Sequence, residues 1–245
     1  SATILLGMEK LFEWLPEPDG DFRVAQGGDW QGSKTANFPV ANLIRAFGPQ
    51  DWKDNWRTIT KARLSQWGFN TIGNWSDISA FRGQKIPYVL PLGNFPRTKT
   101  MLFRDFPDVF NPEYLSNSIR FAKELEAYKE DPWLIGYFMR NEPEWGFGSF
   151  NLASEMLEAN PGTASRTALA AKMKEKYREI NDLNKAWGTD LKSFDELVSQ
   201  NFRRMEDKSA QAKKDLWSFS EEMVSAYVKI PAEELRKVDP HHLNL

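Results

Sequence analysis

The 245-residue sequence contains no cysteine, which excludes a disulfide, a thiolate nucleophile and any metal site built from Cys ligands. No apolar run approaches the roughly 20 residues that a membrane-spanning helix needs. The first residues, Ser1 to Leu6, are too short and too uncharged for a signal peptide. We therefore expect no membrane partner, while the lack of cysteine leaves the redox compartment undetermined.

An excess of charge of one sign is also missing. Lys and Arg number 32 and Asp and Glu number 34, and the two kinds are scattered along the chain. Without a basic stripe to follow a phosphate backbone, nucleic acid is not an expected partner. No Gly-x-Gly-x-x-Gly sequence occurs, which disfavours an open sheet that binds a nucleotide. A hydrophobic content of 41% suits one large domain over residues 1–245.

Segments of helical and strand-like periodicity alternate along the chain, which predicts a parallel α/β fold. Residues 1–50 are rich in Gly and Pro and predict an irregular segment. A helix is expected from about Asp51 to Gly68, followed by strands over 69–75 and 85–90. At helical spacing, one face of this helix carries Trp52, Trp56 and Ile59, together with Leu64 and Trp67.

The second half of the chain repeats this pattern with clearer boundaries. Asn111-Pro112-Glu113 combines a capping residue, a first-turn proline and an acid near the helix dipole, so it predicts a helix start. The uninterrupted apolar run 133–139 predicts a buried parallel strand. A helical insertion is expected over about 146–207, then a long helix from near Lys208 and a strand from His241. The expected buried positions of the two helices are Leu115, Ile119 and Ala122 in the first, and Leu216, Phe219, Met223, Tyr227 and Ile230 in the second.

Right-handed crossovers close such units into either a barrel or an open doubly wound sheet, and we favour the barrel. The expected fold is thus a (β/α)8 TIM barrel, incomplete in this chain, with about strands one to five.

The tetrad Arg140-Asn141-Glu142-Pro143 follows the apolar run 133–139. In a parallel barrel the chemistry collects at the carboxyl ends of the strands, so Glu142 is a catalytic candidate. Glycoside hydrolysis needs one carboxylic acid to protonate the leaving oxygen and a second carboxylate to attack, about 5 Å away in retaining enzymes. Glu142 fits the first role, and Asn141 could hydrogen-bond a neighbouring sugar hydroxyl if the strand bulges or turns there. An ion pair would favour ionised Glu142, so we expect Arg140 not to pair with it.

From composition alone, Glu142 could equally be a loop acid that caps a helix or forms a salt bridge. The neighbouring Glu144 is interpreted as a solvated or supporting acid, because adjacent loop acids seldom face each other across a substrate. His241 and His242 begin a strand, on the barrel face devoted to stability, so no metal or catalytic role is expected for them.

Asn141-Glu142-Pro143 after a buried strand resembles the fourth-strand acid/base signature of the clan A glycoside hydrolases, which are (β/α)8 barrels with retaining chemistry. The resemblance extends over most of the chain. Segments similar to the insertion of family 42 β-galactosidases and family 50 β-agarases are Tyr177–Thr189 and Ser193–Leu197. Segments closer to the agarases are Leu11–Pro16, Trp67–Ser76 and Val238–Leu243.

This resemblance implies that Glu142 is the general acid/base and that Asn141 is its sugar-binding neighbour. It also implies sugar subsites at Asn74, Trp75 and Trp145. For the two Trp residues core packing is an alternative role, and for Asn74 a turn is one. The family takes its nucleophile from the seventh strand, which lies beyond the five strands expected here. The chain alone is therefore expected to be inactive and to associate with itself or with a second chain that completes the barrel.

The implied substrate is a β-linked galactose-containing polysaccharide or oligosaccharide such as agar, with no cofactor and no metal. Action as a β-galactosidase, and a carbohydrate-binding barrel without turnover, are the alternatives that the sequence leaves open. A polysaccharide-degrading enzyme is expected to be secreted or periplasmic.

Overall fold

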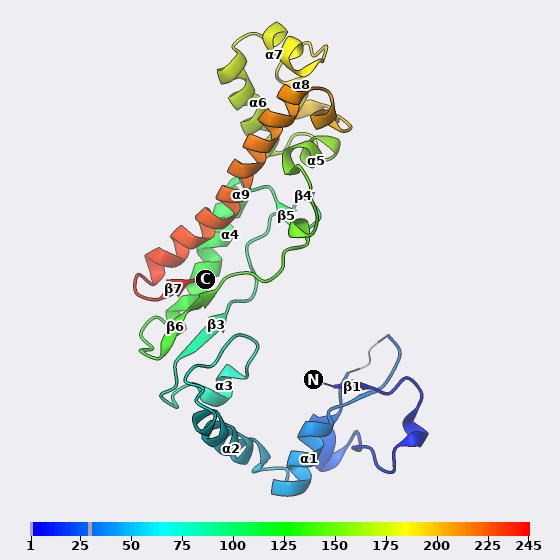
Figure 1. Cartoon of the computed structure of the whole chain (residues 1–245), viewed down its shortest axis with the longest axis vertical. Coiled ribbons are helices and arrows are strands. Elements are labelled where there is room, and N and C mark those ends of the chain that lie inside the picture. The colour runs from blue at the N-terminus through cyan, green and yellow to red at the C-terminus, as the bar shows by residue number, and fades with distance from the viewer. Residues whose placement is uncertain (1, 29–30) are drawn as a thin grey trace. The chain divides into compact units, whose positions relative to one another are not determined.

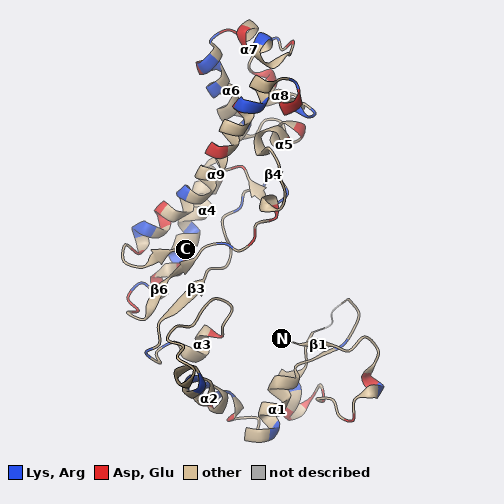
Figure 2. Ribbon diagram, viewed as in Figure 1, with Lys and Arg blue, Asp and Glu red and all other residues tan. Residues whose placement is uncertain are grey.

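The computed structural model describes residues 2–28 and 31–245. The chain divides into two compact units (Figure 1). Unit 1 comprises Ser1–Thr71 and Asp77–Ile86, and unit 2 comprises Ile72–Ser76 and Pro87–Leu245. Figure 2 shows basic and acidic residues interspersed along the helices of both units, in agreement with the scattered charges of the sequence. Within the described residues, no helix combines the length and apolar character that crossing a membrane requires.

Unit 1 begins with more regular structure than the sequence predicts. Strand β1 (Thr3–Ile4) pairs antiparallel with β2 (Thr35–Ala36), and the 3-10 helices η1 (Glu9–Leu11) and η2 (Gly20–Ala25) lie between them in sequence. The expectation of an irregular 1–50 segment is wrong for α1 (Phe38–Phe47). Asn37 caps this helix by accepting from the Val40 N–H at 3.2 Å, and Pro39 occupies its first turn. The small core of the unit consists of Ala25, Ala41 and Ile44.

Helix α2 (Trp52–Gln66) lies where the sequence predicts a helix, and Gly68 follows it with a φ of 79°. The expected face is partly buried at Trp52, Trp56, Ile59 and Leu64, although no α2 side chain is fully buried. The expectation is wrong at Trp67, which is 63% exposed. The ring of Trp56 packs at 5.8 Å against Phe81 of the four-residue helix α3 (Ile78–Phe81). Helices α1 and α3 are short, so within the unit they cover only part of α2.

Unit 2 is built on a three-stranded parallel sheet in the order β3 (Tyr88–Pro91), β6 (Leu134–Phe138), β7 (Leu243–Asn244). The expected strands at 85–90, 133–139 and from 241 are thus confirmed with shorter bounds. The expected strand 69–75 is wrong, because its described residues contribute one parallel bridge, Ile72 to Tyr88, on the other edge of β3. Gly68 precedes this segment and Gly73 lies within it, and a glycine inside a strand weakens the strand.

The strands stand side by side in chain order, with α4 (Pro112–Ala122) between β3 and β6, and α9 (Ala210–Val238) between β6 and β7. This arrangement confirms the α/β class. The barrel itself stays a prediction.

Helices α4 and α9 pack against each other. Asn111 caps α4 as predicted, accepting from the Glu113 N–H at 2.9 Å. The predicted buried stripe of α4 is wrong at two positions, since Leu115 is 45% and Ile119 is 44% exposed within the unit. Ala122 is buried as predicted, and the other buried positions of α4 are Tyr114, Ser118 and Phe121. The packing of the two aromatic rings thus rotates the buried face of the helix away from Leu115 and Ile119. The Tyr114 hydroxyl donates to the Tyr227 carbonyl of α9 at 2.7 Å, which fixes that rotation.

Short helices fill the segment between β6 and α9, and Figure 1 shows them gathered at the far end of α9. They are α5 (Leu152–Glu158), α6 (Ala164–Tyr177), α7 (Ile180–Trp187), α8 (Glu196–Ser199) and η5 (Met205–Asp207), whereas η3 (Lys123–Ala127) lies before β6 and η4 (Glu144–Gly146) soon after it. The buried Arg166 holds several of them by donating to carbonyl oxygens of the α5 and α8 regions. Leu216, Phe219, Met223 and Tyr227 of α9 are buried as predicted, whereas Ile230 is only partly buried.

Gly136 of β6 allows the close approach of β7, and replacing it tests the sheet. A Cβ at Gly136 would overlap the carbonyl oxygen and Cβ of Leu243. We predict that Gly136→Ala lowers the free energy of unfolding by about 1–3 kcal/mol, the usual range for overpacking. Denaturant unfolding followed by circular dichroism measures the change.

Gly93→Ala is the matched control, because a Cβ at Gly93 meets no other atom within 4 Å. Equal stability of the two variants would show that the approach of β7 to β6 is not limited by Gly136.

Candidate active site

The candidate residues all follow segments whose carboxyl-terminal ends lie at the same end of the parallel sheet. Glu142 lies four residues beyond Phe138, the last residue of β6, and Trp75 lies three residues beyond the bridge at Ile72. The Trp75 ring meets Phe138 edge-on, with 5.7 Å between ring centroids. The structure therefore brings Trp75 to the carboxyl end of β6, although β3 lies between the two backbone segments.

Glu142 stands in a turn. It is exposed and has a φ of 39°, in the left-handed region that non-glycine residues seldom adopt. The neighbouring Asn141 is also exposed. Because β6 ends at Phe138, the alternation of a pleated strand does not force these two side chains to opposite faces. Unusual backbone of this kind is concentrated at functional sites.

A hairpin between β3 and α4 holds the 140–147 loop that carries Glu142. The hairpin consists of β4 (Met101–Phe103) and β5 (Phe106–Pro107), with Arg104 and Asp105 at its tip. The Asp105 carboxylate accepts from Arg140 Nη2 at 2.6 Å and from the Trp145 N–H at 3.0 Å. Arg104 Nη1 donates to the carbonyl oxygens of Glu144 and Phe147, each at 2.9 Å. Two adjacent residues thus bind both ends of the loop.

The ion pair with Asp105 takes up the charge of Arg140. Burial of the Asp105 carboxyl acts to raise its pKa, but hydrogen bonds from the Trp145 and Glu144 N–H groups and from Arg140 outweigh that effect and lower it. The carboxylate therefore remains ionised beside the guanidinium. Among the described residues Arg140 has no ion pair with Glu142, in agreement with the expectation from the sequence.

Trp145 and Asn74 occupy more enclosed positions than Trp75, which is 71% exposed. The Trp145 ring packs edge-on against Phe106 and Tyr227, each at 5.2 Å between centroids. Its other side borders a cavity of about 590 Å³ that Trp217 of α9 also lines. Asn74 is half-buried, and its Oδ1 has no hydrogen-bond partner in the described chain. Packing is thus established for Trp145, while its sugar contact stays a prediction.

The two histidines precede β7, at the opposite end of the sheet from Glu142. His242 Nδ1 lies 2.6 Å from the Asp239 carboxylate, which also accepts from the Tyr137 hydroxyl at 2.5 Å. His242 Nε2 lies 3.1 Å from the Asp131 carbonyl oxygen. These contacts tie the start of β7 to β6. Across the described residues, no three His, Asp or Glu side chains come together in a way that could hold a metal ion.

Arg104 and Asp105, which hold the loop of the candidate site, were not predicted from the sequence. The available signal was the run Leu102-Phe103-Arg104-Asp105-Phe106, in which two charged residues interrupt large apolar ones, as at a hairpin tip. The partner of Asp105 is forty residues away at Trp145, so spacing could not have revealed it.

Comparison with known proteins agrees with this architecture. Glycoside hydrolase family 42, described as Beta-galactosidase, matches residues 82–244. The chain belongs to this family. It is also 32% identical over 260 residues to Beta-agarase B of Vibrio sp. (strain JT0107), covering 96% of this chain and 27% of that protein. It spans about a quarter of the length of the curated relatives it matches.

Solved agarase structures share the fold. The crystal structure of an agarase is 27% identical with a TM-score of 0.78, covering 95% of this chain and 36% of the other. The structure of an exo-β-agarase is 26% identical, also with a TM-score of 0.78, covering 96% of this chain and 34% of the other. The likeness to these enzymes therefore includes unit 1, which lies largely outside the segment matched by family 42.

Replacing Asp105 tests whether the hairpin holds the 140–147 loop of this family member. Asp105→Asn removes the ion pair with Arg140, and we predict a loss of about 1.5–3 kcal/mol in the free energy of unfolding, as for a hydrogen bond to a charged group. Chemical denaturation measures the loss, and proteolysis at the loop should become faster.

Asp207→Asn is the control, since it removes an exposed ion pair with Arg204 in the same unit and should change stability by less than about 0.5 kcal/mol. A loop that stays as resistant to protease in Asp105→Asn as in the parent would contradict the clamp.

Proposed function

We propose that this chain contributes the acid/base half of the active site of a retaining glycoside hydrolase that acts on β-linked galactose-containing polysaccharide, as an agarase does. The observation that carries the proposal is the position of Glu142. It is exposed in a turn at the carboxyl end of the central strand, next to Asn141 and at the end of the sheet where Trp75 also lies. Family membership and the agarase relatives support the chemistry and the sugar.

The proposed reaction has two steps. Glu142 gives its proton to the glycosidic oxygen while a second carboxylate, about 5 Å away, attacks the anomeric carbon and forms a glycosyl-enzyme. Glu142 then takes a proton from water, and the water oxygen displaces the second carboxylate. We place that nucleophile outside the residues of this chain, on a later strand of the barrel or on a second chain. This chain alone is therefore proposed to be inactive.

The other candidate residues have supporting roles. Asn141 would hydrogen-bond the hydroxyl beside the reacting carbon, and the exposed face of Trp75 would stack on a sugar ring. The unpartnered Oδ1 of Asn74 would accept from a sugar hydroxyl if a small rearrangement uncovers it. Trp145 would support the floor of the site through its packing on Phe106. Asp105 keeps Arg140 occupied, so that Arg140 is not paired with Glu142.

We also propose the complete (β/α)8 barrel, with this chain as one domain of about five strands. The support is that the parallel strands of unit 2 stand in chain order with a helix between successive members, without the reversal of a doubly wound sheet.

Association with itself or with a second chain is proposed because Leu115 and Ile119 leave apolar surface on α4. A secreted or periplasmic location follows from a polymeric substrate.

Two alternatives are tested with the same protein. Action on short β-galactosides is favoured by the family description, which is Beta-galactosidase. A carbohydrate-binding barrel without turnover would use the same aromatic residues but would lack hydrolysis in the complete protein.

Glu142→Gln tests the acid/base role in the natural protein that carries this sequence. We predict a fall of about 10²–10⁴-fold in kcat on agarose oligosaccharides, the usual contribution of a general acid. A dinitrophenyl galactoside needs no proton for its leaving group, so formation of its glycosyl-enzyme should be far less affected. Added azide should then speed turnover and give a galactosyl azide, because azide needs no general base.

Glu144→Gln is the matched control, since Glu144 is an acid of the same loop to which no catalytic role is given. Equal losses in the two variants, or failure of azide to restore turnover in Glu142→Gln, would remove Glu142 from the acid/base role.

Trp75→Ala tests the stacking role. Because Trp75 is 71% exposed, its loss should change stability little. We predict that KM for agarose oligosaccharides rises about 2–12-fold, which corresponds to the roughly 0.5–1.5 kcal/mol of an aromatic contact. Steady-state kinetics measure this, with the exposed Trp67→Ala as control. An unchanged KM in Trp75→Ala would exclude Trp75 from the sugar subsites.

A further inference from the structure

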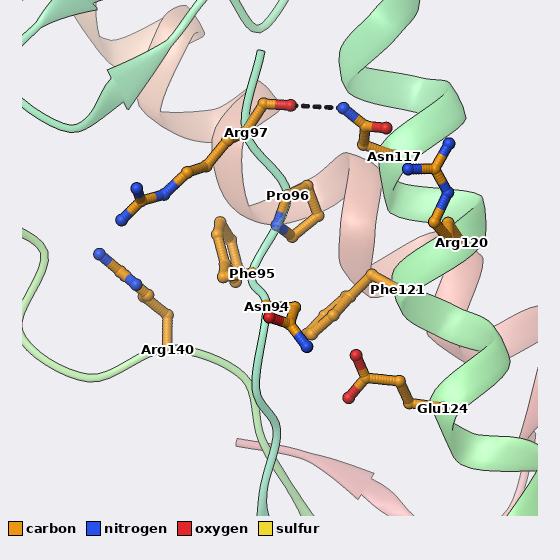
Figure 3. A pocket seen from close by; sticks show the side chains of 9 residues that line it. All are labelled: Asn94, Phe95, Pro96, Arg97, Asn117, Arg120, Phe121, Glu124 and Arg140. Carbon is orange, nitrogen blue, oxygen red and sulfur yellow. Dashed lines mark hydrogen bonds between the residues drawn. The ribbon is translucent and has the colours of Figure 1, made fainter. Parts of the chain in front are cut away.

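A second cavity, of about 600 Å³, is lined by Arg140, by residues of the segment that follows β3 and by residues of helix α4 (Figure 3). Three guanidinium groups and one carboxylate line it, from Arg97, Arg120, Arg140 and Glu124. The volume falls within the range of ligand pockets, and the surplus of positive charge favours an anion. Neither the proposed hydrolysis nor the Asp105 clamp accounts for Arg97 and Arg120.

Two of these charges converge. Figure 3 shows the guanidinium groups of Arg97 and Arg140 on the same side of the Phe95 ring, directed toward one another. Arg140 donates a hydrogen bond through Nη2 to Asp105, whereas its Nε has no hydrogen-bond partner among the described residues. Within the described residues, the side chain of Arg97 has neither a hydrogen bond nor an ion pair. Because Asp105 already offsets the charge of Arg140, the uncompensated charge here is that of Arg97, and an anion placed between the two guanidinium groups would pair with it.

The position of Arg97 is fixed although its side chain is free. Asn117 of α4 donates through Nδ2 to the Arg97 carbonyl oxygen at 2.6 Å, which attaches the segment to the helix. The preceding residues Phe95 and Pro96 are buried, and the Phe95 ring contacts Phe121 at 5.7 Å. The guanidinium of Arg97 is thus presented from an anchored backbone, so less conformational freedom is lost when it binds a ligand.

The cavity is within reach of a sugar held at Glu142. Arg140 and Glu142 are two residues apart, so their Cα atoms are separated by at most about 7 Å. A galactose unit at Glu142, or its neighbour in the chain, could therefore extend a substituent to the Arg140 side of the cavity.

We propose that this cavity binds a negatively charged substituent of the galactan, a sulfate ester or a carboxylate, between Arg97 and Arg140. Both groups present paired oxygen atoms to which guanidinium groups donate two hydrogen bonds. The identity of the sugar rests on the proposed function. The charge preference rests on the cavity alone.

The test is equilibrium binding of three disaccharides to the natural protein by calorimetry. The probes are neutral galactobiose, galactobiose with one sulfate ester and galactobiose with one carboxylate. At least one charged probe should bind about tenfold or more tightly than the neutral one, and this advantage should shrink as salt is added. Comparison of the two charged probes shows which substituent the cavity takes.

Arg97→Gln should remove most of the charged-to-neutral advantage, and Arg97→Lys, which keeps the charge but not the paired donors, is a second variant that should keep only part of it. Arg203→Gln is the matched control, because Arg203 is an exposed arginine of the same unit outside the cavity and should leave the advantage unchanged. Failure of both charged probes to bind more tightly than the neutral one would overturn the proposal. So would an advantage that survives unchanged in Arg97→Gln.

These results are separate from the test of catalysis, since binding is measured without turnover. If Glu142→Gln retains full activity but the charged probes bind more tightly, the proposed role of Glu142 fails and the anion site stands. If Glu142→Gln is inactive and all three probes bind equally, the proposed role of Glu142 stands and the anion site fails.

Discussion

The pairing of β6 on both of its edges is the constraint on which the candidate site depends. Hydrogen bonds to β3 on one side and β7 on the other fix the direction of this strand, and Gly136 provides the space that β7 requires. The carboxyl ends of parallel strands lie at the same end of the sheet, so this pairing also determines where Glu142 emerges. The contact between Trp75 and Phe138 shows that a segment two positions away in the sheet reaches the same place.

The loop beyond β6 needs a second constraint, because Glu142 adopts a backbone conformation that is unfavourable for a residue with a side chain. The hairpin tip supplies it. Asp105 and Arg104 bind the loop through hydrogen bonds to three backbone groups, at Glu144, Trp145 and Phe147, and through the ion pair with Arg140. The same ion pair directs Arg140 away from Glu142 and along the wall of the cavity beside α4. Positioning of the acid and the charge of the cavity are therefore linked through one residue.

The sequence predicts the parts of unit 2 whose signals are local. The cap at Asn111 and the apolar run that ends before Arg140 both lie where the structure has them, and the position of Glu142 at a strand end follows from that run. Features that depend on distant partners were not predictable. The rotation of α4, which exposes Leu115, is set by Tyr114 bonding to α9 113 residues later, and Asp105 meets a loop forty residues away. Trp67 is a large aromatic residue of the kind usually found in a core, but no other element of its unit covers it, so it is exposed.

The central claim is that Glu142 stands at the glycosidic oxygen of a β-linked galactan. The most direct measurement is a crystal structure of the natural protein with Glu142→Gln, soaked with an agarose oligosaccharide that the variant cannot cleave. The account predicts that the side-chain amide introduced by this substitution lies about 2.6–3.2 Å from a glycosidic oxygen, with Asn141 on the adjacent hydroxyl and Trp75 against a sugar ring. An oligosaccharide bound elsewhere, or one whose glycosidic oxygen faces a different carboxyl group, would contradict it.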